Sequence, residues 1–513
     1  MWSSTTFPAG DRAIDTESEL MSTEHLDVLI VGAGLSGIGA AYRLQTELPG
    51  KSYAILEARA NSGGTWDLFK YPGIRSDSDM FTLGYPFRPW TDAKAIADGD
   101  SILRYVRDTA RENGIDKKIR YNRKVTAASW SSADSTWTVT VTTGDEDETL
   151  TCNFLYLCSG YYSYEGGYTP DFPGRESFAG EVVHPQFWPE ELDYSDKKVV
   201  VIGSGATAVT LVPTMSRDAS HVTMLQRSPT YILALPSSDK LSDTIRAVLP
   251  NQLAHSIARW KSIVVNLSFY QLCRRSPARA KRLLNLAISR QLPEEIPLDP
   301  HFTPTYDPWD QRLCVVPDGD LFKALRSGKA SIETDRIDTF TETGIRLASG
   351  RELEADIIVT ATGLKMEACG GMSIEVDGEP VTLGDRYVYK GMMISDVPNF
   401  AMCVGYTNAS WTLRADLTSM YVCRLLTEMD KRDYSKCVPH ATEEMDQRPI
   451  LDLASGYVMR AVEQFPKQGS KSPWNMRQNY ILDRLHSTFG SINDHMTFSK
   501  APARQSTPVP SKS

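Results

Sequence analysis

The sequence has no closely spaced cysteines. Its eight cysteines are scattered over 513 residues and include no C-x-x-C motif. This usage is typical of a reducing compartment, and it predicts neither a disulfide framework nor a zinc site. The histidines show no spacing typical of metal ligands either. We therefore expect a protein without a metal centre.

Targeting signals and long apolar runs are also missing. Residues 1–23 lack the basic start and apolar run of a signal peptide and are rich in Ser, Thr, Asp and Glu. No stretch reaches the roughly 18 apolar residues of a membrane-spanning helix. We expect a soluble, cytoplasmic protein with a disordered N-terminal extension at 1–23. The end of the chain, 496–513, is rich in Ser, Pro and Lys and is predicted to be a disordered tail.

An excess of positive charge is missing as well. There are 55 Lys and Arg residues against 64 Asp and Glu residues, so the formal net charge is −9. This balance disfavours nucleic acid as a partner. Residues 251–290 depart from it, because they contain eight Lys or Arg residues and no acidic residue. Such a stretch is either a solvated helical face or a contact with a membrane surface or with the carrier of an apolar substrate.

A glycine-rich loop at 32–37 directly follows the apolar run 25–31. A helix-compatible stretch comes next, and then a second predicted strand, 52–56, which leads into an acidic residue. This is the βαβ arrangement of a dinucleotide site, in which the glycines allow a tight turn and the helix start offers free N–H groups to a pyrophosphate. The acidic residue is placed to accept a hydrogen bond from a ribose hydroxyl. The residues predicted to contact this first dinucleotide are Gly32, Gly34, Gly37 and Glu57.

The same pattern is repeated at 198–227. The apolar run 198–202 leads into a second glycine loop, and the second strand of this unit, 221–226, ends at Arg227 rather than at a carboxylate. A carboxylate there would repel a 2′-phosphate, whereas a guanidinium binds one through two hydrogen bonds. We therefore interpret the first site as an FAD site and the second as an NADP site. The residues predicted to contact NADP are Gly203, Gly205, Ala206, Thr207 and Arg227.

Two such units predict an α/β protein with two Rossmann-like dinucleotide-binding domains. Apolar strand-and-turn segments at 154–160 and 355–363 mark the points where the chain crosses between them. The FAD domain is then discontinuous, and the NADP domain is inserted in it. A helical insert at 238–300 interrupts the alternation of strands and helices. The predicted boundaries are 24–165 and 364–495 for the FAD domain and 166–237 and 301–363 for the NADP domain.

Two further strings are more specific than the glycine loops. Residues 178–189 have the pattern F-x-G-x-x-x-H-x-x-x-W-P, and residues 63–77 have the pattern G-G-x-W-x-x-x-x-Y-P-G-x-x-x-D. Both resemble the fingerprints of type I Baeyer–Villiger monooxygenases, and the resemblance covers about residues 23–495. Within that family, 306–317 and 405–413 are most similar to the ethionamide-activating branch. The residues of the second string predicted to contact the flavin are Gly64, Thr65, Trp66 and Asp77.

The resemblance implies an enzyme that uses NADPH, FAD and O₂. In the family, the reduced flavin forms a C4a-peroxyflavin that converts a ketone to an ester or lactone, and sulfides or thioamides are further substrates. Arg312 and Asp77 fall where the family's catalytic arginine and its carboxylate partner lie. Gln311 stands where many members have a lysine that helps to bind the 2′-phosphate, so we expect a weaker preference for NADPH. Trp411 belongs either to the substrate pocket or to the core.

The string at 178–189 is predicted to act as a hinge or to orient its surroundings. Its histidine lies in a Gly-containing linker between the two cofactor units, beside aromatic residues whose packing could change as NADP moves. We therefore do not expect this histidine to be a general base. The residues assigned to the hinge are Phe178, Gly180, His184, Trp188 and Pro189.

Three other functions share part of this pattern. A flavin-containing N- or S-monooxygenase has both glycine loops and a similar histidine string, but characteristically lacks the terminal Trp-Pro and the pair of Asp77 and Arg312. A non-catalytic redox sensor would bind FAD and NADP without turnover. A flavoprotein disulfide reductase is disfavoured, because no cysteine pair follows the first glycine loop. The substrate and the oligomeric state are not specified by the sequence.

Overall fold

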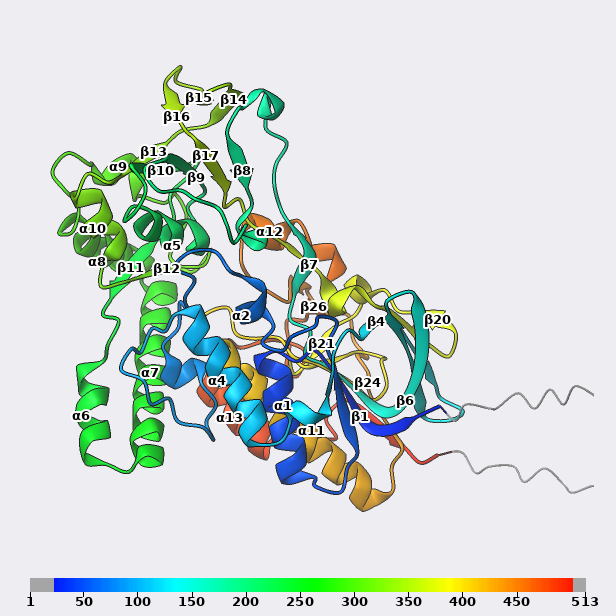
Figure 1. The fold of residues 1–513 in the computed structure, drawn as a ribbon. Coiled ribbons are helices and arrows are strands. Elements are labelled where there is room, and N and C mark those ends of the chain that lie inside the picture. Colours follow the sequence, from blue (N-terminus) through cyan, green and yellow to red (C-terminus); the bar gives the residue numbers. More distant parts are fainter. Residues whose placement is uncertain (1–22, 502–513) are drawn as a thin grey trace, which may run out of the picture.

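The computed structural model describes residues 23–501, whose helices and strands are arranged around two sheets (Figure 1). Within this range no helix is long and apolar enough to cross a membrane. The extension predicted at 1–23 lies outside the described residues apart from Thr23. Shorter or peripheral elements of this range are α2 (Thr65–Leu68), α3 (Met80–Leu83), α4 (Gly99–Glu112), α12 (Gly456–Met459), α13 (Tyr480–Phe489), β21 (Val388–Tyr389), β22 (Met393–Ile394), β25 (Arg448–Pro449) and β26 (Lys467–Gln468).

The first sheet has nine strands and is assembled from segments that lie far apart in the sequence. At its centre β1 (His25–Val31) pairs in parallel with both β2 (Tyr53–Leu56) and β6 (Glu146–Leu157). From a much later part of the chain, β23 (Phe400–Met402) joins β6 in parallel. This pairing makes the first domain discontinuous, as predicted. The sheet also contains β3 (Ile119–Arg120), β4 (Lys124–Ser131), β5 (Thr136–Thr143), β19 (Ser373–Val376) and β20 (Glu379–Pro380).

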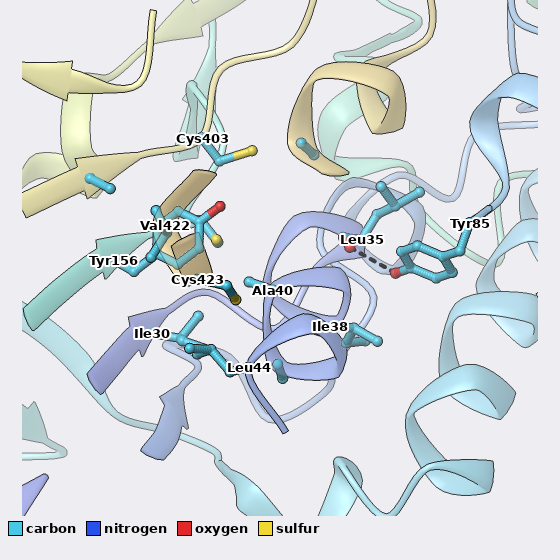
Figure 2. Packing of buried hydrophobic residues seen from close by; sticks show 14 of the residues in the cluster. Ile30, Leu35, Ile38, Ala40, Leu44, Tyr85, Tyr156, Cys403, Val422 and Cys423 are labelled. Carbon is cyan, nitrogen blue, oxygen red and sulfur yellow. Dashed lines mark hydrogen bonds between the residues drawn. The ribbon is translucent and has the colours of Figure 1, made fainter. Parts of the chain in front are cut away.

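Helix α1 (Leu35–Glu47) covers this sheet with an apolar face and packs against α11 (Trp411–Arg432). Figure 2 shows this packing, with the strand residue Ile30 and the ring of Tyr85 on different sides of the helix. The Tyr85 hydroxyl donates a 2.7 Å hydrogen bond to the carbonyl of Leu35 in the first turn. These contacts fix the start of the helix and, with it, the preceding glycine loop. The buried apolar residues of α1 are Leu35, Ile38, Ala40, Ala41 and Leu44.

The second sheet has five parallel strands in the order β13-β10-β9-β17-β8. Helices α5 (Ala206–Met215) and α10 (Asp320–Arg326) pack against one another beside it. A small antiparallel sheet of β14 (Ile337–Thr341), β15 (Gly344–Leu347) and β16 (Glu352–Glu354) follows β13. The five strands are β8 (Glu181–Val183), β9 (Lys198–Ile202), β10 (His221–Gln226), β13 (Ala330–Thr334) and β17 (Ile357–Thr360).

The chain crosses between the two sheets twice, at adjacent places. It leaves the first sheet through β7 (Tyr162–Gly167) and returns through β18 (Leu364–Met366), and these two strands pair antiparallel. The second dinucleotide-binding domain is therefore inserted in the first, which confirms the predicted architecture.

A helical insert separates β11 (Ile232–Leu235) from β12 (Cys314–Pro317), which pair with one another in parallel. In Figure 1 the insert is drawn in green beside the two sheets. Its helices are α6 (Lys240–Val248), α7 (Asn251–Arg275), α8 (Pro277–Ser289) and α9 (Leu298–His301).

Half of the cations in the basic stretch 251–290 have partners inside the fold. Arg259 is buried and donates hydrogen bonds to the carbonyls of Phe81 and Gly84, at 2.9 and 2.8 Å. Intramolecular charge pairing and carbonyl binding thus account for four of the eight cations, and contact of the stretch with a membrane stays a prediction. The other three paired cations are Lys261 with Asp239, Arg274 with Asp310, and Lys281 with Asp307.

The boundary predicted for the C-terminal tail is wrong. Residues 496–499 form β27 (Met496–Ser499), which pairs antiparallel with β24 (Lys436–Pro439). Met496 is buried against the first domain. Local composition could not reveal this strand, because its partner lies in a distant part of the chain. The rest of the predicted tail, 502–513, lies outside the described residues.

Candidate active site

A cavity of about 1350 Å³ lies between the two glycine loops and takes part of its wall from each of them. It is larger than the roughly 300–1,000 Å³ typical of a pocket for one small ligand. Two dinucleotides that meet at their reactive ends need a space of this kind. The predicted site residues that line it are Gly32, Gly34, Glu57, Gly64, Thr65, Trp66, Asp77, Gly203, Gly205, Ala206, Thr207, Arg227, Gln311, Arg312 and Trp411.

The first glycine loop is shaped by two glycines with different tasks. Gly32 has φ +102°, and a Cβ there would lie 2.6 Å from the carbonyl oxygen of Cys158. A Cβ on Gly37 would lie 1.9 Å from the carbonyl oxygen of Gly32, so this residue packs the helix against the loop and does not line the cavity. No side chain caps the start of α1. Its N–H groups are therefore available to a pyrophosphate.

Glu57 lies at the end of β2, buried beside this loop. Its carboxylate accepts hydrogen bonds from the backbone N–H groups of Ala33, at 2.8 Å, and of Arg59, at 3.0 Å. Burial raises the pKa of Glu57, and these two hydrogen bonds oppose the rise. The carboxylate thus stabilises the glycine loop, and its remaining lone pairs fit a ribose hydroxyl.

The segment 63–77 brings its glycines against the first loop. Gly64 has φ +56°, and a Cβ built on Gly34 would lie 3.4 Å from the Cα of Gly64. The N–H of Gly63 donates a 3.0 Å hydrogen bond to the carbonyl of Ala33. Backbone and the indole of Trp66 therefore form one continuous wall with the dinucleotide loop. This close approach is the physical reason for two glycines at these positions.

The second loop has the same construction. Gly203 has φ +141°, and a Cβ there would lie 2.4 Å from the carbonyl oxygen of Ala361. A Cβ on Gly205, in contrast, would meet nothing within 4 Å, so open space lies before the uncapped start of α5. Arg227, directly after β10, is exposed on the wall of the cavity. This arrangement fits a pyrophosphate and a 2′-phosphate.

Arg312 and Asp77 line the same cavity but form no ion pair among the described residues. Burial raises the pKa of Asp77, and the charges of Arg312 and Arg75 oppose that rise. Arg75 pairs instead with Asp320. The task of Asp77 as the carboxylate partner of Arg312 therefore stays a prediction. The two groups interact through space across the cavity.

Three tyrosines near Arg312 were not predicted from the sequence. Tyr161, Tyr162 and Tyr457 line the cavity, and the hydroxyls of the first two lie 3.1 Å apart. Burial opposes the charge of Arg312, but Tyr161, Asp77 and the other phenols raise its pKa above the ordinary value. The adjacent pair Tyr161-Tyr162 follows the turn at the end of a predicted strand, and this position could have indicated that the pair belongs to the site. Nothing local to Tyr457 indicates its position.

Trp411 lines the cavity and also packs against the core of the first domain. Its indole N–H donates a 2.7 Å hydrogen bond to the hydroxyl of Ser36, in the first turn of α1. Its ring centroid lies 5.1 Å from that of Tyr161. The first turn of α11 is thereby connected to both the first glycine loop and the tyrosines near Arg312.

The residues of the fingerprint 178–189 do not line the cavity. His184 lies at the double crossing: its Nε2 bonds to the carbonyl of Gly363 at 3.2 Å, and a Cβ on Gly167 would lie 1.9 Å from its ring. Burial lowers the pKa of His184, which favours the neutral ring. Phe178 packs edge-on to Phe340. Of the remaining three, Gly180 approaches the carbonyl of Asp356, Trp188 packs on the core of the second domain, and Pro189 follows it.

The cysteines and acidic residues of the described chain indicate no disulfide and no metal-binding centre. All eight cysteines lie in this range, buried and as free thiols. No group of three or more His, Cys, Asp or Glu side chains in residues 23–501 is placed to hold a metal ion.

Solved structures share this fold. The oxidised steroid monooxygenase bound to NADP has a TM-score of 0.73 at 20% identity, over 93% of this chain and 100% of that one. The OTEMO complex with FAD and NADP has a TM-score of 0.67 at 23% identity, over 81% and 87%. At these identities the likeness concerns the fold alone.

Closer sequence relatives cover almost the whole chain. The FAD-containing monooxygenase EthA of Mycolicibacterium smegmatis is 54% identical over 474 residues, which are 92% of this chain and 96% of that one. EthA of Mycobacterium tuberculosis is 53% identical over 484 residues, 94% and 99% of the two chains. An NAD(P)-binding Rossmann-like model matches residues 30–97. Since a flavin-binding monooxygenase-like model also matches residues 79–368, more than half of its length, the chain belongs to the flavin-binding monooxygenase-like family.

Proposed function

We propose that this protein is an NADPH- and O₂-dependent flavin monooxygenase that inserts one oxygen atom next to a ketone carbonyl. Ketone, O₂, NADPH and a proton would become ester or lactone, NADP⁺ and water. The oxygen atom could also be transferred to the sulfur of a sulfide or thioamide. The observation that supports the proposal best is the guanidinium of Arg312, which faces a cavity lined by both dinucleotide loops.

The charge of Arg312 supports oxygen insertion at a carbonyl. An attacked carbonyl develops negative charge on its oxygen, and a fixed cation in a water-poor site stabilises that charge strongly. The guanidinium stays protonated despite its burial, and the carboxylate of Asp77 favours the charged form further. Asp77 would balance this charge across the cavity, and Trp411 with Tyr161 would close one side of the space against water.

The two loops would hold the two cofactors. The first loop with Glu57 and the segment 63–77 fits FAD, which supplies the activation of O₂ once NADPH has reduced it. The second loop with Arg227 fits NADP. His184 would keep the crossing strands in register while the second domain changes position, a hinge task that needs packing and not proton transfer.

Incubation of the FAD-loaded enzyme with NADPH, ¹⁸O₂ and a panel of ketones tests this proposal. Solved structures of similar fold include a cyclohexanone monooxygenase and a steroid monooxygenase, so the panel starts with small cyclic ketones and steroid ketones. An ester or lactone with one labelled oxygen is the expected product. Absence of ester from every ketone would overturn the proposal.

Parallel arms identify the two alternatives. Labelled sulfoxide or N-oxide without any ester would indicate a flavin-containing N- or S-monooxygenase. Slow or absent bleaching of the flavin by NADPH, with no stimulation by any substrate, would indicate a redox sensor. The relatives' description as FAD-containing monooxygenases favours the enzymatic functions.

A further inference from the structure

Arg336 lies at the cavity edge next to Arg227, although more than a hundred residues separate them in the sequence. The strands β10 and β13 are parallel neighbours, and Gln226 at the end of one is level with Thr334 at the end of the other. The N–H of Asp335 donates a 3.0 Å hydrogen bond to the carbonyl of Gln226, which extends this register by one residue. Neighbouring strands lie about 4.8 Å apart, so the residues that follow them share one edge.

Both arginines are exposed and line the cavity. Neither forms an ion pair with a carboxylate within residues 23–501. Two other arginines of the same region differ in this respect: Arg346 pairs with Asp338 and Arg351 pairs with Glu333, and neither lines the cavity. Arg227 and Arg336 therefore line the cavity beside the second glycine loop as two cations without an ion pair among the described residues.

Asp335 directly precedes Arg336 and, like Asp171, also lines the cavity. Its carboxylate accepts hydrogen bonds from the N–H of Arg336, at 2.7 Å, and from the N–H of Ser349, at 3.2 Å. Hydrogen bonds from Ser349 and Arg336 hold its pKa below the ordinary value. The carboxylate is thus occupied within its own loop, where it stabilises the turn that carries Arg336.

We infer that Arg336 is a second cation of the 2′-phosphate site and, together with Arg227, sets the preference for NADPH over NADH. This inference rests on the assignment of NADP to the second loop. A dianionic phosphate is held best by more than one charge-assisted donor. Gln311, on the cavity wall, offers no charge for that purpose. Arg336 supplies the charge from a different strand.

The test compares two adenosine probes on the FAD-loaded enzyme. Calorimetry measures the affinity for 2′,5′-ADP, which carries the 2′-phosphate, and for 5′-AMP, which lacks it. Loss of one charged hydrogen bond weakens binding by about tenfold or more. For Arg336→Ala we expect about this loss for 2′,5′-ADP and none for 5′-AMP. Arg336→Lys, which keeps the charge, should retain most of the affinity.

Arg346→Ala is the matched control, because it removes one cation from the same region but not from the cavity wall. It should leave both affinities unchanged. An equal loss for both probes in Arg336→Ala, or no loss at all, overturns the inference while leaving the NADP assignment intact. A wild-type enzyme that binds both probes equally overturns the NADP assignment itself, and the inference with it.

Discussion

The indole N–H of Trp411 donates a 2.7 Å hydrogen bond to the Ser36 hydroxyl and so ties the first turn of α11 to the first turn of α1. Ser36 is buried and belongs to the first glycine loop, where that loop enters α1. A wall residue of the cavity and the dinucleotide loop are therefore positioned by one another.

Trp411→Phe and Ser36→Ala should each lower the free energy of unfolding by about 1 kcal/mol, the typical net value of one hydrogen bond. The double variant should lose little more than either single variant, because both remove the same bond. Chemical denaturation of the FAD-loaded protein measures the cycle. Full additivity of the two losses would show that the bond contributes nothing.

Arg312→Ala should leave flavin reduction by NADPH largely intact and abolish ester formation from ketones. The reason is that the cation faces the space where a carbonyl oxygen would gain charge, whereas hydride transfer needs no such cation. Anaerobic stopped-flow reduction and product analysis separate the two steps. Gln311→Ala, which changes the neighbouring wall residue, is the control and should keep ester formation. Ester from Arg312→Ala at the wild-type rate would remove Arg312 from the mechanism.

Asp77→Asn should stabilise the folded protein near neutral pH while impairing ketone oxygenation. Burial raises the pKa of Asp77 above its ordinary value of 3.8, so the folded chain holds a proton that the unfolded chain releases. As the pH rises from the pKa of this carboxyl in the unfolded chain to its higher pKa in the folded chain, the carboxyl lowers the free energy of unfolding. An amide does not titrate, so Asp77→Asn avoids this loss of stability. The gain in Tm should shrink as the pH falls. A lower Tm for Asp77→Asn at pH 7 would contradict the sign.

Gly203→Ala and Gly205→Ala should behave oppositely. At Gly203 the φ of +141° and a Cβ 2.4 Å from the Ala361 carbonyl oxygen predict a protein that folds poorly. At Gly205 the Cβ meets nothing within 4 Å, so the fold should persist while the methyl group occupies space before α5. Circular dichroism and the KM for NADPH test this pair: Gly205→Ala should raise KM without loss of structure. An unchanged KM would place the pyrophosphate elsewhere.

His184→Ala should slow the reduction of the flavin by NADPH without altering the affinity for FAD. The ring lies against Gly167 at the end of β7 and bonds to the carbonyl of Gly363 just before β18, and it does not line the cavity. Its loss should disturb the approach of the second domain. The exposed His25, whose ring forms hydrogen bonds with Thr151 and Asn153 on β6, provides the control variant His25→Ala. Equal reduction rates in His184→Ala and wild type would argue against a hinge function.

The local parts of both dinucleotide sites were predictable from the sequence. Each site depends on features of one short segment. These are an apolar strand, a glycine at φ +102° or +141° after it, and a charged residue after the second strand. Each of them restricts the residue type at its own position, so it can be detected without knowledge of the rest of the chain. The inserted arrangement followed from the order of these segments.

The contacts between distant segments were decided by the tertiary structure alone. The family resemblance implied that Asp77 and Arg312 belong to one site, but only the tertiary structure shows that both line the cavity without an ion pair between them. Tyr457 reaches the same wall from the C-terminal part of the chain, and Arg336 reaches Arg227 through the register of β13 on β10. Local residue types determine backbone turns and strands, whereas side-chain neighbours depend on which elements pack together. That packing is a cooperative property of the whole chain.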